Sequence, residues 1–228
     1  GKSMNFGWQR ENIIEFAERV YDDALSAKLI SSLIVDECNK LYEGEPGDDT
    51  TVAAVRIRER APVNLLFGPP ADPKDCTKMM TLFFSKEGKK IVCGGTTSKI
   101  AADYLHEPIT TSLDYGSDPD IPPVGHVKGI DLVTEGVITM SRVVQYAKEF
   151  LNNSDLQNMW SLQTDGASLI AQMLFEYATD INFFVGKAIN PAHQNPDLPI
   201  TFGIKIQIVH ELTDCLEKMG KQVKVSYF

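Results

Sequence analysis

The sequence has few basic residues and no long apolar run, and these absences exclude several classes of protein. Its 22 Lys and Arg residues are outnumbered by 31 Asp and Glu residues, which leaves a formal net charge of −9. Phosphate backbones are bound by clustered Lys and Arg, and no such cluster is present, so we expect no nucleic-acid partner. No apolar run approaches the roughly 18–20 residues that a membrane span requires. The first residues lack the basic-then-apolar pattern of a signal peptide, and we expect no membrane association.

Cysteine is also scarce. The four cysteines, Cys38, Cys76, Cys93 and Cys215, are far apart and form no CxxC pair. Structural zinc sites are typically built from such closely spaced pairs, so we expect none. Separate reduced thiols are typical of a cytoplasmic protein, and we expect that localisation.

The chain is expected to form two domains, residues 1–59 and residues 60–228. Apolar residues recur at spacings of three and four between Ile13 and Leu41, which predicts a pair of helices that ends near Gly44. The β-rich segment TTVAAVRI at residues 50–57 predicts a short strand, and the charged segment RERAP after it marks the boundary. A helix pair and one strand cannot bury a core alone. We therefore expect this strand to pair with the sheet of the second domain or with a second copy of the chain.

Strands and helices alternate along residues 60–228. Strands are predicted at residues 63–68, 89–95 and 130–136, and each precedes a helical pattern. A further helix is predicted at residues 166–181 and a short strand follows it, while residues 200–228 favour strand, helix and strand. The last strand is a candidate for an antiparallel edge. This alternation predicts an α/β fold in which helices flank a mostly parallel sheet.

Two adjacent aspartates, Asp48 and Asp49, stand directly before the predicted strand of the first domain, in the segment GEPGDDTTVAAVRI. Carboxylate oxygens are the ligands that Mg²⁺ and Mn²⁺ prefer, so the pair could hold a divalent cation. A turn that begins a strand uses the same residue types. Chemistry alone favours the turn.

Residues 5–57, which contain this pair, resemble the C-terminal end of SpoIIE-type metal-dependent serine/threonine protein phosphatases, relatives of the type-2C (PPM) phosphatases. In that family two helices precede a Gly-Asp-Asp-Thr-Thr-Val strand. The resemblance implies that Asp48 binds a catalytic Mn²⁺ or Mg²⁺ and that Asp49 lies beside it. It also implies hydrolysis of phosphoserine or phosphothreonine in a protein substrate, by a water that a binuclear metal site activates.

The departure from the family pattern concerns the other metal ligands. In the family, further aspartates precede this motif in Asp-Gly segments, and no such segment precedes Asp48 here. One aspartate pair cannot hold two ions in a catalytic geometry. We therefore expect the end of a phosphatase domain, inactive alone, followed by a regulatory α/β domain. Glu135-Gly136 is similar to an Asp-Gly segment but follows the pair, and we interpret this as coincidence. The tail from Val185, with the GGTT and DLVTEG segments, resembles a C-terminal region of some bacterial family members, which implies no particular activity.

Three predicted strand ends carry residues that suit an anion. Glycines allow close approach to the N–H groups at a helix start, and hydroxyl groups add donors. Because the carboxyl ends of parallel strands meet at one edge, we expect the three loops to line one crevice for a small anionic ligand. Tight turns with Ser or Thr caps would have the same sequence, and neither the Walker nor the dinucleotide spacing is present. The loop residues are Gly68; Gly94, Gly95, Thr96, Thr97 and Ser98; and Thr134, Glu135 and Gly136.

Three further residues, Asp131, His193 and Cys93, have two interpretations each. Asp131 and Glu135 could contact ribose hydroxyls or a cation, whereas Asp131 could also be an edge residue that the backbone satisfies. His193, in a loop rich in Pro and Asn, could be a general base or a ligand, or it could hold the loop by a hydrogen bond. Cys93 would be a reactive thiol if the helix start lowered its pKa, but a small buried core residue is favoured.

Three functions follow from these patterns. The first is part of a bacterial protein phosphatase, and the second is a regulatory module that senses a small anion. The third is a non-catalytic scaffold that mediates homodimer formation, in which the three loops are only turns. We expect a combination of the first two, a phosphatase segment joined to a ligand-binding α/β domain.

Overall fold

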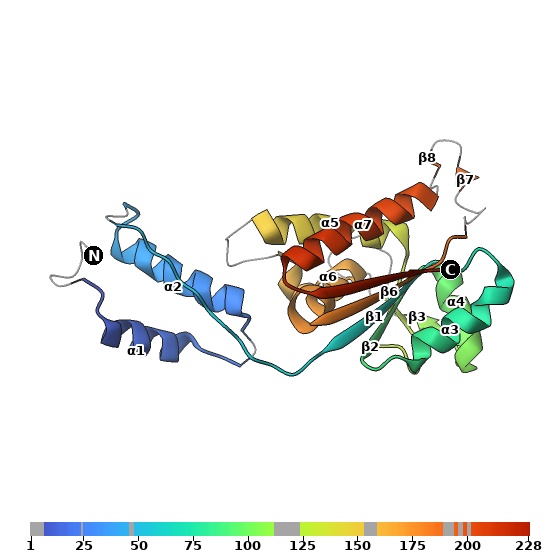
Figure 1. The fold of residues 1–228 in the computed structure, drawn as a ribbon, viewed down its shortest axis with the longest axis horizontal. Helices are drawn as coiled ribbons and strands as arrows, with labels where there is room; N and C mark the ends of the chain where they lie inside the picture. The colour runs from blue at the N-terminus through green and yellow to red at the C-terminus, as the bar shows by residue number, and fades with distance from the viewer. Residues whose placement is uncertain are drawn as a thin grey trace. The chain divides into compact units, whose positions relative to one another are not determined.

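The computed structural model describes residues 7–23, 25–45, 48–111, 124–152, 159–188, 194–195, 198–199 and 202–228. The chain divides into two compact units at the junction between Glu59 and Arg60. Each unit has its own secondary structure (Figure 1). Among the described residues, none of the helices combines the length and the apolar character that a bilayer span demands.

The first unit contains the two expected helices, α1 (Arg10–Val20) and α2 (Ala27–Leu41). Ser26 caps α2, because its hydroxyl oxygen accepts a hydrogen bond from the Leu29 N–H at 3.2 Å. Neither helix has a fully buried residue. The helix pair therefore forms no dry core, as expected for so few elements.

The predicted strand at residues 50–57 is wrong for this chain. Residues 49–61 have no regular secondary structure, and Val55 and Ile57 are 90% and 96% exposed. Arg56 fixes the segment instead, since its guanidinium donates to the carbonyl oxygens of Leu25 at 2.7 Å and Asp23 at 2.6 Å. The physical reason is that β propensity reflects packing against a neighbouring strand, and neither sheet of the described residues offers one to this segment. Among the described residues, the segment joins neither sheet, and the expected alternative, pairing with a second copy of the chain, stays a prediction.

The second unit is built on a seven-stranded sheet in the order β3-β4-β5-β2-β1-β6-β9 (Figure 1). The five strands from β5 to β9 are parallel, and β3 and β4 form an antiparallel edge. The α/β fold class with a mostly parallel sheet is thus confirmed. The strands are β1 (Pro62–Phe67), β2 (Lys89–Cys93), β3 (Thr110–Thr111), β4 (Gly125–His126), β5 (Leu132–Thr134), β6 (Asp180–Val185) and β9 (Gln222–Tyr227). A separate two-stranded sheet joins β7 (Gln194–Asn195) and β8 (Leu198–Pro199).

The order of the parallel strands is that of a doubly wound sheet. The chain starts at β1, runs outward through β2 to β5, returns to β6 beside β1, and continues to β9. In such sheets the loops diverge at the point where the direction reverses, and ligands bind at the carboxyl edge near that point. Here the reversal lies between β1 and β6.

Helices cover both faces of this sheet (Figure 1). Side chains of α3 and α4 pack on one face, and those of α5, α6 and α7 pack on the other. β1, β2, β5 and β6 are accordingly buried over most of their length, as parallel strands are in general, whereas the outer strand β9 is not. The helical segments are η1 (Pro73–Asp75), α3 (Cys76–Ser85), α4 (Gly95–Leu105), α5 (Val137–Asn152), η2 (Met159–Leu162), α6 (Gly166–Ala171), the π-helical η3 (Gln172–Tyr177) and α7 (Phe202–Lys218).

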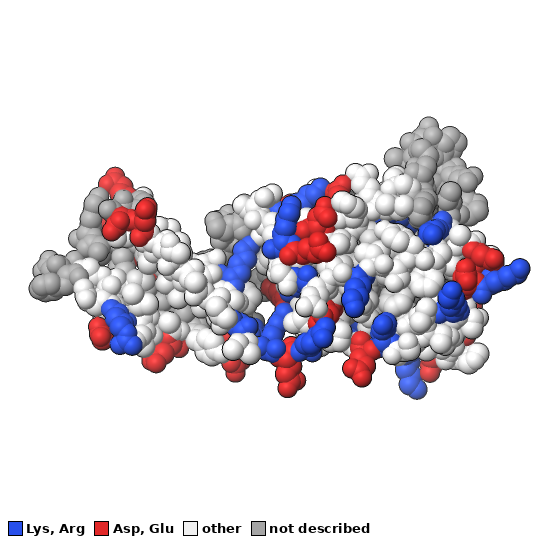
Figure 2. All heavy atoms as spheres, in the orientation of Figure 1, with Lys and Arg blue, Asp and Glu red and all other residues white. Residues whose placement is uncertain are grey.

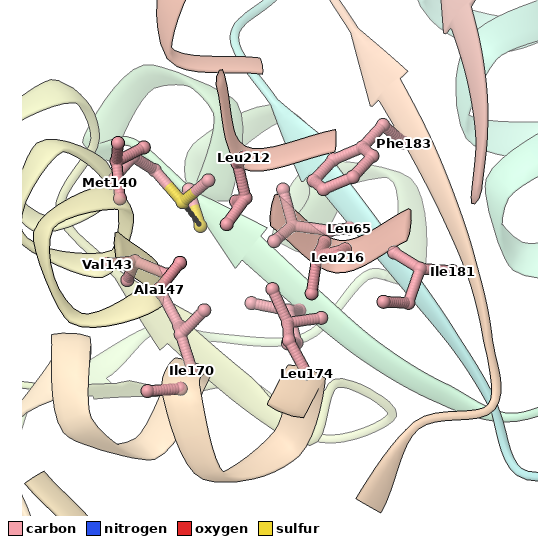
Figure 3. Close-up of a cluster of buried hydrophobic side chains, with 14 of the residues drawn as sticks. Leu65, Met140, Val143, Ala147, Ile170, Leu174, Ile181, Phe183, Leu212 and Leu216 are labelled. Carbon is pink, nitrogen blue, oxygen red and sulfur yellow. Dashed lines mark hydrogen bonds between the residues drawn. The ribbon is translucent and has the colours of Figure 1, made fainter. Parts of the chain in front are cut away.

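The larger core lies between the sheet and α5, α6 and α7. Figure 3 shows Leu65 of β1 and Phe183 of β6 beside Leu212 and Leu216 of α7. These side chains are fully buried. Removal of one of them to Ala would cost roughly 2–5 kcal/mol, so this core fixes α7 on the sheet.

Two expectations for the C-terminal region are wrong. Residues 202–218 form α7 rather than a strand followed by a helix, because Ile208, Val209 and Leu212 recur at helical spacing and bury one face. The last strand, β9, pairs with β6 in parallel rather than antiparallel orientation. A single helix between two strands of one sheet carries the chain back to the starting edge, which makes the two strands parallel.

Candidate functional site

The three glycine-containing loops meet at the carboxyl edge of the sheet. The loops after β1, β2 and β5 line one open pocket, together with the first turn of α7, and its cavity volume is about 110 Å³. The parallel arrangement of β1, β2 and β5 brings the three loops together. The lining residues are Phe67, Gly68, Pro69, Cys93, Gly94, Gly95, Thr96, Thr97, Glu135, Gly136, Val137, Ile138 and Lys205.

The loop after β2 presents the amino end of α4 to the pocket. Gly94, with φ of 109°, is the N-cap; its N–H donates to the Thr134 carbonyl oxygen at 2.9 Å. Its own carbonyl oxygen accepts from the Ser98 N–H at 2.8 Å, which is the first hydrogen bond of the helix. The amides of Gly95, Thr96 and Thr97 therefore have no intrahelical acceptor. They carry the positive end of the helix dipole, the feature that binds anions at helix starts.

Thr97 adds a buried hydroxyl to the same place. Its side chain is 1% exposed and lines the pocket, and its Oγ1 faces Gly94, where a Cβ would lie 3.2 Å away. Over the described ranges, this hydroxyl makes no hydrogen bond. The Thr97 hydroxyl is therefore a donor or acceptor available to a ligand in the pocket.

Lys205 supplies a buried positive charge. Its side chain is only 7% exposed, and its Nζ donates to the Ala188 carbonyl oxygen at 2.6 Å. Burial lowers the pKa of the Lys205 ammonium, because desolvation penalises the charged form. Within the part of the chain that the structure describes, no carboxylate forms an ion pair with Lys205. An ammonium group has three donors, and within the described residues only the one to Ala188 is used.

Glu135 places a negative charge near the amino ends of α5 and α4. Its Oε2 accepts a hydrogen bond from the Gly136 N–H at 3.1 Å, at the start of α5. Its Oε1 would lie 3.6 Å from a Cβ on Gly95, at the start of α4. The pocket therefore contains one ammonium group and one carboxylate.

The crevice at the reversal point itself is filled by backbone. The Gly186 N–H donates to the Phe67 carbonyl oxygen at 3.0 Å, and the Ala188 N–H donates to the Pro69 carbonyl oxygen at 3.1 Å. A Cβ on Gly186 would lie 2.0 Å from the Pro69 carbonyl oxygen, so only glycine permits this crossing. The open pocket is displaced toward the β1, β2 and β5 side as a result.

Several of the predicted site residues do not line this pocket. Ser98 and Thr134 are buried hydrogen-bonding residues of the scaffold: the Ser98 Oγ donates to the Gly94 carbonyl oxygen at 2.9 Å, and the Thr134 Oγ1 donates to the Glu135 carbonyl oxygen at 3.0 Å. His193 lies outside the described residues.

The expected ligand role of Asp131 is wrong. Asp131 precedes β5 and therefore lies at the amino end of that strand, away from the pocket edge. Its Oδ2 accepts a hydrogen bond from the Lys90 N–H at 2.7 Å. The alternative interpretation, an edge residue satisfied by the backbone, is the one that the geometry supports.

Cys93 lines the pocket but is no reactive thiol. Its side chain is fully buried, and desolvation raises the pKa of its thiol to about 12. The Thr134 Oγ1 donates to the Cys93 Sγ at 3.4 Å, which lowers the pKa only in part. The thiolate is the nucleophilic form of cysteine, so Cys93 is inert at neutral pH.

The aspartates of the first unit do not complete a metal centre. Asp48 and Asp49 are exposed, and the Asp49 N–H donates to the Asp48 Oδ1 at 2.8 Å. Over the described ranges, no three His, Cys, Asp or Glu side chains are grouped so that they could hold a metal ion. The residues present therefore do not fit the binuclear Mn²⁺ or Mg²⁺ site that the family resemblance implies.

Lys205 was the site residue that the sequence patterns did not reveal. The segment around it alternates apolar and polar residues and favours a strand. If the segment is instead taken as a helix, Lys205 lies on the same face as Ile208, Val209 and Leu212, which are all buried. A lysine within the buried stripe of a helix is the signal that could have found it, because lysine is almost never buried without a function or a partner.

The fold and the pocket together define a doubly wound α/β domain with a small pocket at its carboxyl edge, whose largely apolar wall carries a few polar and charged groups. No protein-family model matches the chain, and neither a curated protein nor a solved structure is significantly similar to it.

Proposed function

We propose that residues 60–228 form a regulatory module that binds a small anionic ligand at the pocket between the β1, β2 and β5 loops. The observation that carries this proposal is Lys205, which is 7% exposed, lines the pocket and has no carboxylate partner among the described residues. A buried ammonium group costs several kcal/mol unless a counter-charge accompanies it. An anionic ligand would supply that counter-charge.

The amino end of α4 supports the same ligand charge. The amides of its first turn and the Thr97 hydroxyl supply donors, and the helix dipole favours a negative group by about 0.3–1 kcal/mol. Hydrogen bonds to charged groups contribute about 1.5–3 kcal/mol each. Because these donors already lie in place, ligand binding requires little reorganisation.

For the first unit, the phosphatase function implied by the family resemblance stands as part of this proposal. In the parent phosphatase, Asp48 would be one ligand of Mn²⁺ or Mg²⁺, and the phosphorylated substrate protein would bind elsewhere. The described carboxylates form no group of three, so further metal ligands would have to come from other residues. We assign no catalytic step to residues 1–228.

A scaffold or homodimer function is the second candidate. It is favoured by Val55 and Ile57, apolar side chains that are 90% and 96% exposed in the segment after α2. Exposed apolar side chains of this kind mark interaction surfaces when they occur together. This function needs no ligand, so a binding experiment separates it from the first.

The test is a thermal-shift titration of the full chain with inorganic phosphate, simple carboxylates, and adenine and guanine nucleotides. We expect at least one anion to raise the midpoint of unfolding, because a ligand that binds only the folded state stabilises it. The variant Lys205→Met removes the ammonium group and should abolish the shift. Lys221→Met is the matched control, because the Lys221 Nζ also donates to a backbone carbonyl oxygen, that of Ala178 at 2.7 Å, and does not line the pocket.

A shift that survives in Lys221→Met and disappears in Lys205→Met supports the module. A flat response of the wild-type chain to every anion contradicts the proposal and favours the scaffold. An equal shift in both variants would place the bound anion away from Lys205.

A further inference from the structure

We infer that the ligand of this pocket carries a hydrogen-bond donor, a hydroxyl or an ammonium group, next to its anionic group. This inference rests on the proposed function and extends it to the chemical class of the ligand. The residue that carries it is Glu135, which lines the pocket with Lys205.

The position of Glu135 excludes a bare anion as the best ligand. Its two carboxylate oxygens lie against the amino ends of α5 and α4, next to Gly136 and Gly95. A ligand that presented only negative charge to these helix starts would meet a like charge at close range, which is unfavourable. An ionised carboxylate is an acceptor only, so the ligand group that faces Glu135 has to be a donor.

Other residues of the pocket supply donors for the anionic group of the ligand. Lys205 and the unpartnered hydroxyl of Thr97 line the same pocket, and both are more than nine-tenths buried. The Lys205 ammonium group, the Thr97 hydroxyl and the first amides of α4 can each donate a hydrogen bond to a negative group. The pocket thus offers donors to one part of the ligand and an acceptor to another.

The walls of the pocket indicate an organic molecule rather than an inorganic ion. Phe67, Pro69, Val137 and Ile138 contribute apolar surface. The cavity volume of about 110 Å³ is several times the roughly 10–15 Å³ that one water molecule needs on the same measure. A ligand with a short carbon chain would contact these walls.

The experiment compares isosteric ligands that differ at one terminal group. Propyl phosphate, 2-hydroxyethyl phosphate and 2-aminoethyl phosphate form one series, and butyrate, 3-hydroxypropionate and β-alanine form the carboxylate series. Affinities are measured by calorimetric titration of the full chain. In at least one series we expect the hydroxyl or amino member to bind about tenfold or more tightly than the methyl member, because Glu135 gains a charged hydrogen bond only with a donor.

Two variants of Glu135 distinguish the donors. Glu135→Ala should remove the preference altogether and bring the three members of a series to similar affinity. Glu135→Gln keeps an acceptor oxygen but no charge, so it should retain a preference for the hydroxyl member and lose most of a preference for the ammonium member. Glu149→Ala is the control, because it removes an exposed carboxylate from the same helix, α5, outside the pocket.

The inference and the proposed function fail in different ways. If the methyl members bind as tightly as their counterparts and binding still depends on Lys205, the donor requirement is wrong and the anion-binding module stands. The donor requirement is also wrong if Glu135→Ala leaves the preference unchanged. If no member of either series and no anion of the thermal-shift panel, nucleotides included, binds the wild-type chain, the proposed function itself is overturned.

Discussion

The ammonium group of Lys205 lies where a side chain on Gly68 would have to be: a Cβ atom built on Gly68 would stand 2.7 Å from the Lys205 Nζ. The two residues come from different elements, the loop after β1 and the first turn of α7. Gly68 also has φ of 85°, a conformation that residues with a side chain rarely adopt. The absence of one methyl group thus makes room for the buried charge of the pocket.

The first prediction concerns Gly68→Ala. The new Cβ would displace the flexible end of the Lys205 side chain, lie 3.1 Å from the Gly186 carbonyl oxygen and strain the backbone, so we expect a loss of about 1–3 kcal/mol in the free energy of unfolding. Anion binding should be lost with it. Urea unfolding and ligand titration measure the two effects.

Gly220→Ala is the matched control for Gly68→Ala. Gly220 has φ of 80°, but a Cβ there meets nothing within 4 Å. It should show the backbone strain alone, about 1–2 kcal/mol, and normal anion binding. If both variants lost the same free energy of unfolding, the contact between position 68 and Lys205 would have no effect on stability.

The second prediction concerns the pH dependence of stability. Burial lowers the pKa of Lys205 in the folded state, so between that pKa and the ordinary value of 10.5 the unfolded chain binds more protons. The stability contribution of this group therefore rises with pH across that interval. We expect Lys205→Met to unfold at a higher urea concentration than the wild type at pH 7, and the difference to shrink as the pH approaches 10.

Parallel urea titrations at pH 7 and pH 10 check this prediction without any ligand. Lys221→Met again provides the reference for loss of an ammonium group that donates to a carbonyl oxygen. A Lys205→Met variant that is less stable than the wild type by the same amount at both pH values would show that the hydrogen bond to Ala188 outweighs the cost of burial.

The third prediction concerns the four thiols. Cys38 and Cys76 are partly exposed, whereas Cys93 and Cys215 are buried. Alkylation of the native chain at pH 8.5, followed by mass spectrometry of its peptides, should modify Cys38 and Cys76 and leave Cys93 unmodified, since the pKa of the Cys93 thiol is about 12. The unfolded chain should react at all four positions. Preferential modification of native Cys93 would restore the reactive-thiol hypothesis.

The fourth prediction concerns Asp180, which begins β6. The Arg60 Nε donates to the Asp180 Oδ2 at 3.0 Å, and this contact holds the pKa of Asp180 below its ordinary value of 3.8. A carboxyl group with a lowered pKa stabilises the fold above the unfolded pKa, and this contribution disappears as the pH falls through the folded pKa. We therefore expect Arg60→Gln to be destabilised relative to the wild type at pH 7 and to approach it at the acid end of that interval.

Urea unfolding at a series of pH values between 7 and 2.5 checks this. Lys99→Gln, which removes a positive charge from an exposed position on α4, is the control for net charge. Salt should reduce the effect of Arg60→Gln, because the arginine is largely exposed. A difference that persists unchanged when Asp180 is protonated would show that Arg60 stabilises the fold in another way.

Much of the second unit could be predicted from its sequence, because its local signals agree with one another. Asp72 before Pro73 marks a helix start, and its Oδ1 does accept the Lys74 N–H at 2.9 Å. The glycines at 68 and 94 follow apolar runs that a parallel sheet buries, and a parallel order is enough to bring their loops to one edge.

The failures have a common cause, since each depended on a neighbour that the local sequence does not specify. Residues 50–57 have strand propensity but no partner strand, so they stay irregular. Around Lys205 a period of two and a period of 3.6 fit equally well, and only the packing of α7 on the sheet decides between them. Asp131 is a different case: it lies near the amino end of the predicted strand at residues 130–136 and directly before β5 in the structure, so a role at the carboxyl edge did not follow even from the predicted strand.

The Gly186 and Ala188 N–H groups donate to the carbonyl oxygens of Phe67 and Pro69, and these hydrogen bonds affect how the protein would respond to ligand binding. They connect the segment after β6 to the end of β1 and the loop that follows it, and so restrict the separation of β1 and β6 on ligand binding. We therefore expect a ligand to bind with little structural rearrangement of these loops. A ligand in the pocket would contact Lys205 of α7 and Glu135, which directly precedes α5, so α7 and α5 are the helices through which binding would act on an attached domain.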